Sequence, residues 1–176
     1  MKNLLIISGT NRPDALSPVI AQHYARLVVE AGQQAEVIDL RDLPADFAFS
    51  ALYENSGKNP DFNVLRDRMA AADKFVFIVP EYNGSFPGVL KAFIDGLEFP
   101  ATFTGKKAAL VGVSAGLLGS SHAMSHLTDI LNYCGAHVLA RKPRLTKISA
   151  ALAGDNIVEA SYIDQLRKQI AELIAF

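Results

Sequence analysis

The sequence has a single cysteine, Cys134, among its 176 residues. One cysteine excludes an internal disulfide and a zinc site built from several thiolates. Long apolar runs near the start are also missing, because the run Leu4–Ile7 is too short for a signal peptide or a membrane span. We therefore expect a cytoplasmic protein with no membrane partner.

An excess of charge of either sign is absent, because 17 Lys and Arg stand against 18 Asp and Glu, for a net charge of −1. Binding to nucleic acid requires a basic surface that displaces phosphate counterions, so no nucleic-acid partner is expected. The dense negative charge of a small acidic electron carrier is missing as well. Hydrophobic residues make up 50% of the chain, which excludes a disordered protein. At about 150 residues per domain, the length predicts one domain over residues 1–176.

Short apolar runs alternate with longer stretches of helical periodicity along the chain. The runs predict five strands, at Leu4–Ile7, Ala35–Ile38, Phe75–Val79, Ala108–Val113 and, more weakly, His137–Ala140. Most runs are continuous, which is typical of parallel strands covered by helices on both faces. About five helices are expected, with apolar faces at Val19–Val28, Val89–Leu97, Met124–Cys134 and Ile163–Ile174. The alternation predicts an α/β fold with one parallel sheet between two helical layers.

Ligands of such sheets bind beyond the carboxyl ends of the strands, where the winding direction reverses. The loops after Ile7, Val79 and Val113 lie there, and all three are rich in Gly, Ser, Thr or Asn. The stretch Pro44–Asn59 exceeds the usual connection length, so we expect an irregular lid or interface element there.

The loop after the first strand has the features of a monophosphate site. Gly9 lies in a turn that leads into a helix, for which Ser17 is the expected N-cap and Pro18 the first residue. Free amides and the helix dipole favour an anion there, and Thr10 and Arg12 add a hydroxyl and a fixed charge. Neither a Walker loop nor a dinucleotide fingerprint is present. The alternative is a capped turn with an exposed arginine.

The loop after the third strand, Pro80–Lys91, can hold an aromatic heterocycle. Asn83-Gly84 favours a tight turn with positive φ, which points consecutive amides outward. Tyr82 and Phe86 offer flat apolar area for stacking or packing. The alternative is an ordinary turn with two aromatic side chains packed beneath it.

The stretch Pro80–Asp95 closely resembles the characteristic motif of the NAD(P)H-dependent FMN reductases. The resemblance extends through Gly9–Arg12, Asp39–Pro44 and Ala72-Asp73, and so covers most of the chain. It implies a flavodoxin-like three-layer α/β/α sandwich, with a five-stranded parallel sheet in the order 2-1-3-4-5. It also implies an FMN cofactor, NADPH or NADH as hydride donor, and a homodimer or homotetramer. The implied electron acceptor is a small molecule such as a quinone, free flavin, an azo dye or chromate.

The resemblance also implies roles for particular residues. The FMN phosphate would contact Thr10, Arg12 and Ser17, and the isoalloxazine ring would contact Pro80, Glu81, Tyr82, Asn83, Gly84 and Ser85. The amides of Gly84 and Ser85 would stabilise charge on the reduced ring, and Tyr82, Asn83 and Phe86 would flank the pocket. The third loop would border the flavin at Ser114, Gly116 and Gly119. No catalytic side chain is implied, because the cofactor carries the chemistry. Ala15 and His122 depart from the family, which often has Ser and Arg there.

Two other functions fit parts of the sequence. Gly112–Gly116 matches the nucleophile elbow of a serine hydrolase, with Ser114 as nucleophile and with Asp129 and His137 following in the required order. The glycines after Ser114 predict a loop rather than the immediate helix of an elbow, and this fold usually needs more strands. The second alternative is a flavodoxin-type electron carrier without nicotinamide turnover.

Two further features are interpreted as structural. His122 and His126 have the four-residue spacing of a zinc pair, but no third ligand is evident, so exposed or hydrogen-bonded histidines are expected. Cys134 belongs to an apolar helical face, which predicts a buried, inert thiol.

Overall fold

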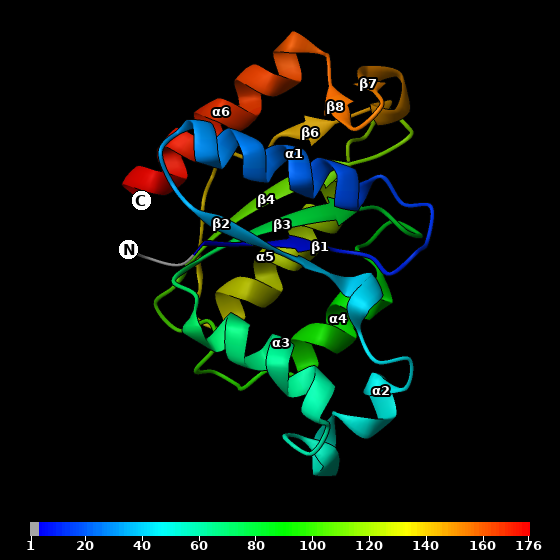
Figure 1. The fold of residues 1–176 in the computed structure, drawn as a ribbon, viewed down its shortest axis with the longest axis vertical. Helices are drawn as coiled ribbons and strands as arrows, with labels where there is room; N and C mark the ends of the chain where they lie inside the picture. The colour runs from blue at the N-terminus through cyan, green and yellow to red at the C-terminus, as the bar shows by residue number, and fades with distance from the viewer. Residues whose placement is uncertain (1–3) are drawn as a thin grey trace.

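The fold is a parallel sheet between two helical layers, described for residues 4–176 by a computed structural model (Figure 1). Its strands are β1 (Leu4–Ser8), β2 (Ala35–Asp39), β3 (Lys74–Pro80), β4 (Lys107–Val113) and β5 (His137–Val138). They lie in the order β2-β1-β3-β4-β5, and every pair is parallel. The predicted fold class and strand order are therefore confirmed.

The two layers of helices cover opposite faces of the sheet (Figure 1). One layer contains α1 (Ser17–Glu30) and α6 (Ala160–Ala175), and the other contains α3 (Pro60–Ala71), α4 (Gly88–Asp95) and α5 (Ser121–Tyr133). Successive strand residues point to opposite faces. Phe75 and Phe77 thus join the core beneath α3, α4 and α5, while Val76 and Ile78 join the core beneath α1 and α6. Burial of both faces explains why the strand sequences are continuously apolar.

The start of α1 differs from the prediction. Leu16 is the N-cap and makes no side-chain capping bond, whereas Ser17 is the first helical residue. The Ser17 side chain is buried. The predicted stop is confirmed, because Gly32 follows the helix with φ of 75° and its amide bonds to Val29.

The fifth predicted strand, His137–Ala140, is split in the structure. β5 pairs with the start of β4, and a separate strand β6 (Arg144–Leu145) pairs with its end. Pro143 lies just before β6 and has no amide to donate, although its carbonyl accepts a bond from Gly112 N. A neighbouring strand therefore accompanies β4 up to the edge where ligands bind.

The stretch Pro44–Asn59 is more regular than predicted. It contains α2 (Phe47–Ser50) and a 3₁₀ turn at Tyr53–Asn55, and another 3₁₀ turn, Leu40–Asp42, precedes it. Phe47 stacks on Phe62 of α3 with ring centroids 5.7 Å apart, which anchors the segment to the core.

A small hairpin near the C-terminal helix was not predicted. Strands β7 (Leu152–Ala153) and β8 (Asn156–Ile157) follow the 3₁₀ turn Ile148–Ala151 and pair with each other. His23 of α1 accepts a bond from Ile157 N at 3.4 Å through Nδ1. Two-residue strands carry too little periodicity to be recognised in sequence. Within residues 4–176, no helix is long and apolar enough to cross a membrane.

Candidate functional site

A cleft of about 480 Å³ lies where β1, β3 and β4 end. Its lining comes from three strand-end loops and from the turn after β6: Arg12, residues 15–17, residues 80–82, residues 113–118 and residues 148–149. The sequence predicted a ligand site at this edge of the sheet, and of the predicted residues the cleft brings together Arg12, Ser17, Pro80, Glu81, Tyr82, Ser114 and Gly116.

The loop after β1 is held tightly against the sheet. Gly9 donates to Ile78 O at 3.0 Å, and a Cβ on Gly9 would lie only 2.6 Å from the same oxygen. Beyond this point the loop turns outward, and Arg12 is exposed without a carboxylate partner among residues 4–176. A fixed positive charge therefore stands beside the N-terminus of α1, where the first amides of a helix lack intrahelical partners.

Thr10 lies beneath the cleft rather than in its wall. The residue is fully buried, and its Oγ1 lies 2.9 Å from the Tyr82 hydroxyl and accepts a bond from Arg12 N at 3.3 Å. The guanidinium carbon of Arg12 is 5.9 Å from the centroid of the Tyr82 ring. Thr10 thus connects the loop after β1 to the loop after β3.

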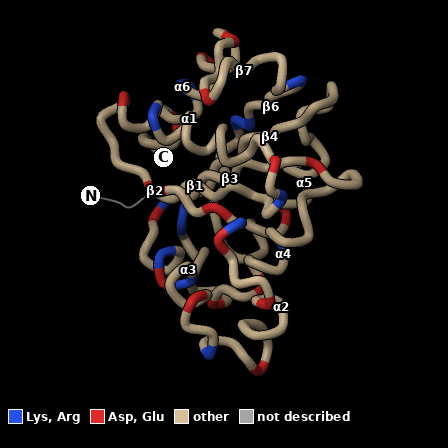
Figure 2. The backbone as a smooth tube through the Cα atoms, turned by 45° about the vertical axis from the view of Figure 1, so that its right-hand side comes forward, with Lys and Arg blue, Asp and Glu red and all other residues tan. Residues whose placement is uncertain are grey.

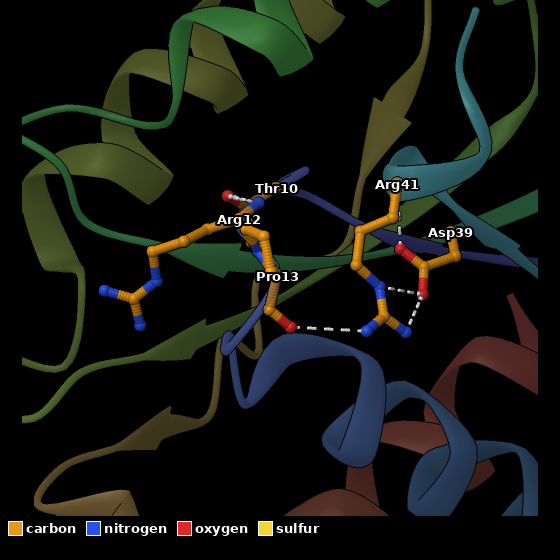
Figure 3. Close-up of polar contacts among 5 residues, drawn as sticks. All are labelled: Thr10, Arg12, Pro13, Asp39 and Arg41. Carbon is orange, nitrogen blue, oxygen red and sulfur yellow. Dashed lines mark hydrogen bonds and ion pairs between the residues drawn. The ribbon is translucent and has the colours of Figure 1, made fainter.

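Arg41 braces the loop after β1 from the side of β2 (Figure 3). Its Nη2 is 2.6 Å from Asp39 Oδ2, and its Nη1 donates to Pro13 O at 3.4 Å. The hydrogen bonds that the Arg41 guanidinium donates to Asp39 raise the pKa of Arg41 above its usual value. In Figure 3 the Arg12 side chain extends away from this pair, which leaves its charge available to a ligand.

The turn after β3 has the predicted left-handed conformation. Asn83 and Gly84 have φ of 52° and 77°, and Tyr82 and Ser85 form an isolated bridge across the turn. The Ser85 amide donates to Tyr82 O at 3.1 Å, so it is not free for a ligand as the sequence had led us to expect. Within residues 4–176, the amides of Asn83 and Gly84 donate to no protein acceptor.

Two side chains of this loop point elsewhere than expected. Ser85 Oγ lies 2.9 Å from Nδ1 of His126 on α5, so the hydroxyl ties the turn to that helix. Phe86 is buried in the core beneath α3, α4 and α5 and does not line the cleft. The aromatic surface that the loop offers to the cleft is therefore Tyr82 alone.

The loop after β4 is closed by its own hydrogen bonds. Ser114 Oγ donates to Gly116 O at 3.0 Å and accepts from Gly119 N at 3.1 Å. Gly119 packs under the loop, and its carbonyl lies only 2.1 Å from where a Cβ on Gly112 would be. Close backbone approach therefore requires glycine at residues 112 and 119, whereas a Cβ on Gly116 would meet no atom within 4 Å.

The hydrolase interpretation of Ser114 is wrong. His137 pairs with Lys107 at the opposite end of β4, about 20 Å along the strand from Ser114. The residues after Ser114 form a loop, and α5 begins only at Ser121. The imidazole of His137 therefore cannot reach the Ser114 hydroxyl as a base.

His122 is exposed, and His126 contacts Ser85 Oγ through Nδ1. Within residues 4–176, no group of three or more His, Cys, Asp or Glu side chains could hold a metal ion. Cys134 is buried, and burial raises the pKa of its thiol. The thiol is therefore protonated and shielded.

Several lining residues were missed in the sequence. Leu117 and Leu118 are 73% and 57% exposed beside the cleft, an unusual position for leucine that only the folded chain reveals. Ile148 and Ser149 reach the cleft because β6 carries the chain back alongside β4. Glu81, which the sequence had placed at the site, has a buried Oε2 that finds no hydrogen-bond partner among residues 4–176.

The fold and the cleft define a flavodoxin-like protein with a ligand site at the carboxyl ends of its strands. Residues 2–150 match the family model described as NADPH-dependent FMN reductase. An NAD(P)H-dependent FMN reductase of Pseudomonas aeruginosa is 35% identical over 158 residues, which cover 86% of this chain and 80% of that protein. The chain therefore belongs to the NADPH-dependent FMN reductase family, and it is an oxidoreductase that uses FMN and NAD(P)H.

Two further similarities accompany this match. A 2-hydroxy-1,4-benzoquinone reductase of Burkholderia sp. is 29% identical over 149 residues, which cover 81% of this chain and 76% of that protein. The solved structure of FerB, a flavoenzyme NAD(P)H:(acceptor) oxidoreductase from Paracoccus denitrificans, superposes with a TM-score of 0.78 at 23% identity. It covers 99% of this chain and 96% of that chain, and it supports the fold.

Proposed function

We propose that the chain transfers electrons from NAD(P)H to a small acceptor through an FMN held in the cleft at the ends of β1, β3 and β4. The main support is the composition of that cleft, which has an unpaired Arg12 and a helix N-terminus at one end and flat apolar walls at the other. Its volume of about 480 Å³ suits a small-molecule cofactor.

At one end of the cleft, Arg12 and the first amides of α1 would hold the phosphate of FMN. Ser17 is buried against this end, and its hydroxyl has no hydrogen-bond partner among residues 4–176, so it can donate to a phosphate oxygen. Thr10 supports Arg12 and Tyr82 from below. Ala15 lines the same end without contributing a donor.

At the other end, the isoalloxazine ring would lie among Pro80, Glu81 and Tyr82 on one side and the loop from Ser114 to Gly119 on the other. The unpartnered Glu81 Oε2 suits an N–H group at the edge of a heterocycle. The amides of Asn83 and Gly84 would stabilise negative charge on the reduced ring. Leu117 and Leu118 would lose exposed apolar area by covering the ring.

Bound FMN supplies the hydride chemistry between a nicotinamide donor and a second substrate. The residues of this chain bind and orient the two substrates, and we assign no side chain as catalytic acid or base. A quinone is the proposed acceptor class, with free flavin, azo dyes and chromate as further candidates. The homodimer or homotetramer, the cytoplasmic location and the single domain over residues 1–176 stay predictions.

The test combines a binding and a kinetic measurement. FMN should bind stoichiometrically, with quenched flavin fluorescence and a raised melting temperature. Anaerobic stopped-flow mixing with NADPH or NADH should bleach the flavin absorbance, and a quinone should restore it. Flavin that binds but stays oxidised with both nucleotides would instead indicate an electron carrier.

A further inference from the structure

A second hollow, of about 310 Å³, lies between α5 and the segment that contains β6. Lys142 and Arg144 form its basic wall, and Figure 2 shows blue segments next to β6. The opposite wall belongs to α5, with Met124, Asp129 and the hydroxyl residues Ser121, Ser125 and Thr128. Thr128 Oγ1 donates to Met124 O at 2.7 Å, so the hollow combines two cations with the hydroxyl donors of Ser121 and Ser125 and one carboxylate.

Neither Lys142 nor Arg144 makes an ion pair or a side-chain hydrogen bond within residues 4–176. The neighbouring Arg141 differs, because its Nε is 2.6 Å from Glu172 Oε1. Asp129 lies in the same hollow but beyond ion-pair distance of both cations. The positive charge of the hollow is therefore not neutralised by the protein itself.

The backbone places this charge next to the proposed flavin site. Leu145 is buried in the core beneath α1 and α6, so the preceding residue Arg144 points to the opposite face, toward α5. A Cβ on Gly119 would lie 2.5 Å from Arg144 Cβ, so the arginine stem packs against the loop after β4. Arg144 also pairs with Gly112, one residue before Val113 in the cleft wall.

Two cations with hydroxyl donors suit a phosphomonoester, which carries a double negative charge and several acceptor oxygens. We propose that this hollow binds the phosphomonoester of a nucleotide substrate that enters beside the flavin cleft. The proposal rests on the proposed function, which brings two such groups to this edge. One is the 2′-phosphate that distinguishes NADPH from NADH, and the other is the 5′-phosphate that distinguishes free FMN, as acceptor, from riboflavin.

The test uses the FMN-loaded protein and the double variant Lys142→Ala/Arg144→Ala. Alanine at residue 144 keeps the Cβ that packs on Gly119, so the loop after β4 retains its support. The variant Arg144→Lys keeps the positive charge, so it should retain most of the phosphomonoester binding that the double variant loses. Lys58→Ala is the matched control, because Lys58 is exposed in the turn before α3 and also lacks a carboxylate partner among residues 4–176.

Two ratios of kcat/KM distinguish the source of the phosphate. One compares NADPH with NADH at a fixed quinone concentration, and the other compares FMN with riboflavin as acceptor at fixed NADH. The double variant should lower one ratio by about tenfold or more, the loss expected when charge-assisted bonds are removed. A fall in the first ratio identifies the hydride donor, and a fall in the second identifies the acceptor.

A binding measurement separates this proposal from the proposed function. Adenosine 2′,5′-bisphosphate and adenosine, which carry no nicotinamide and differ in their phosphomonoesters, are titrated calorimetrically into wild type and double variant. Preferential binding of the bisphosphate that disappears in the double variant supports a phosphomonoester site even if neither nicotinamide reduces the flavin. The proposal would be overturned if the double variant left both kcat/KM ratios and the affinity for the bisphosphate unchanged. It would also be overturned if the double variant changed them only as much as Lys58→Ala does.

Discussion

The Tyr82 hydroxyl lies 2.9 Å from Thr10 Oγ1, and this contact joins two loops that are 72 residues apart in sequence. Arg12 belongs to the same cluster, because its amide bonds to Thr10 Oγ1 and its guanidinium lies near the Tyr82 ring. The phosphate end and the ring end of the proposed flavin site are thus mechanically connected.

Tyr82→Phe should weaken FMN binding by about fivefold, since one neutral hydrogen bond contributes about 1 kcal/mol. The ring remains, but the two loops lose their bond. Fluorescence titration measures the affinity. The control is Tyr133→Phe, because Tyr133 is exposed on α5 and stacks with Phe99, away from the cleft lining. Equal affinities of the two variants would show that the bond has no part in binding.

Arg12→Ala should weaken FMN binding by about 10-fold or more while leaving riboflavin binding nearly unchanged, because a charge-assisted bond to phosphate is worth about 1.5–3 kcal/mol. Riboflavin lacks the phosphate and so serves as the internal control. In the wild-type protein, higher salt should reduce the difference in affinity between FMN and riboflavin, because salt screens the charge of Arg12. A parallel loss for both flavins would place Arg12 against the ring instead.

Gly112→Ala should destabilise the protein by about 1–3 kcal/mol through overpacking. The new methyl group would lie only 2.1 Å from Gly119 O, so the loop after β4 must move. Thermal unfolding should show a melting temperature lower by several degrees, since about 1 kcal/mol shifts a protein of this size by about 2–4 °C. Gly88→Ala is the control, because a Cβ there meets no atom within 4 Å. A normal melting temperature for Gly112→Ala would contradict the close packing.

Stability should fall as pH drops below about 6.5, partly because of His23. Desolvation is the main cause that lowers the pKa of His23 in the folded protein, with Arg26 adding to it. The unfolded chain then binds the proton more readily, so the contribution of His23 is present above the unfolded pKa and is lost as pH falls through the folded pKa. Melting temperatures between pH 7.5 and 5 should decline less steeply in His23→Gln than in His122→Gln, whose histidine is exposed. If the melting temperatures of the two variants fell equally steeply with pH, His23 would have no part in the pH dependence of stability.

The strands and most helices could be predicted from the sequence because their signal is local. Phe75–Val79 is continuously apolar since both faces of β3 are buried, and that pattern needs no knowledge of the partners. The turn at Asn83-Gly84 was also predictable, because left-handed backbone favours these residue types. The N-cap was misassigned by one residue, to Ser17 instead of Leu16, because sequence signals locate helix ends less precisely than helix bodies.

The contents of the site depended more on tertiary structure. The motif predicted Phe86 beside the flavin, but apolar contacts with α3, α4 and α5 hold it in the core. The hydroxyl of Ser85 is bound by His126, which no local pattern connects to it. Ile148 and the basic pair Lys142 and Arg144 reach the same edge of the sheet only because β6 runs beside the end of β4.

The sequence alone determined where the four long strands β1 to β4 and the ligand-binding loops lie, because burial period and turn chemistry are properties of neighbouring residues. The tertiary structure alone decided which side chains of those loops face the cleft, which are consumed by internal bonds, and which cations are left unpaired. Those outcomes depend on contacts between residues far apart in the chain, whose geometry is set when the sheet and its two helical layers pack together.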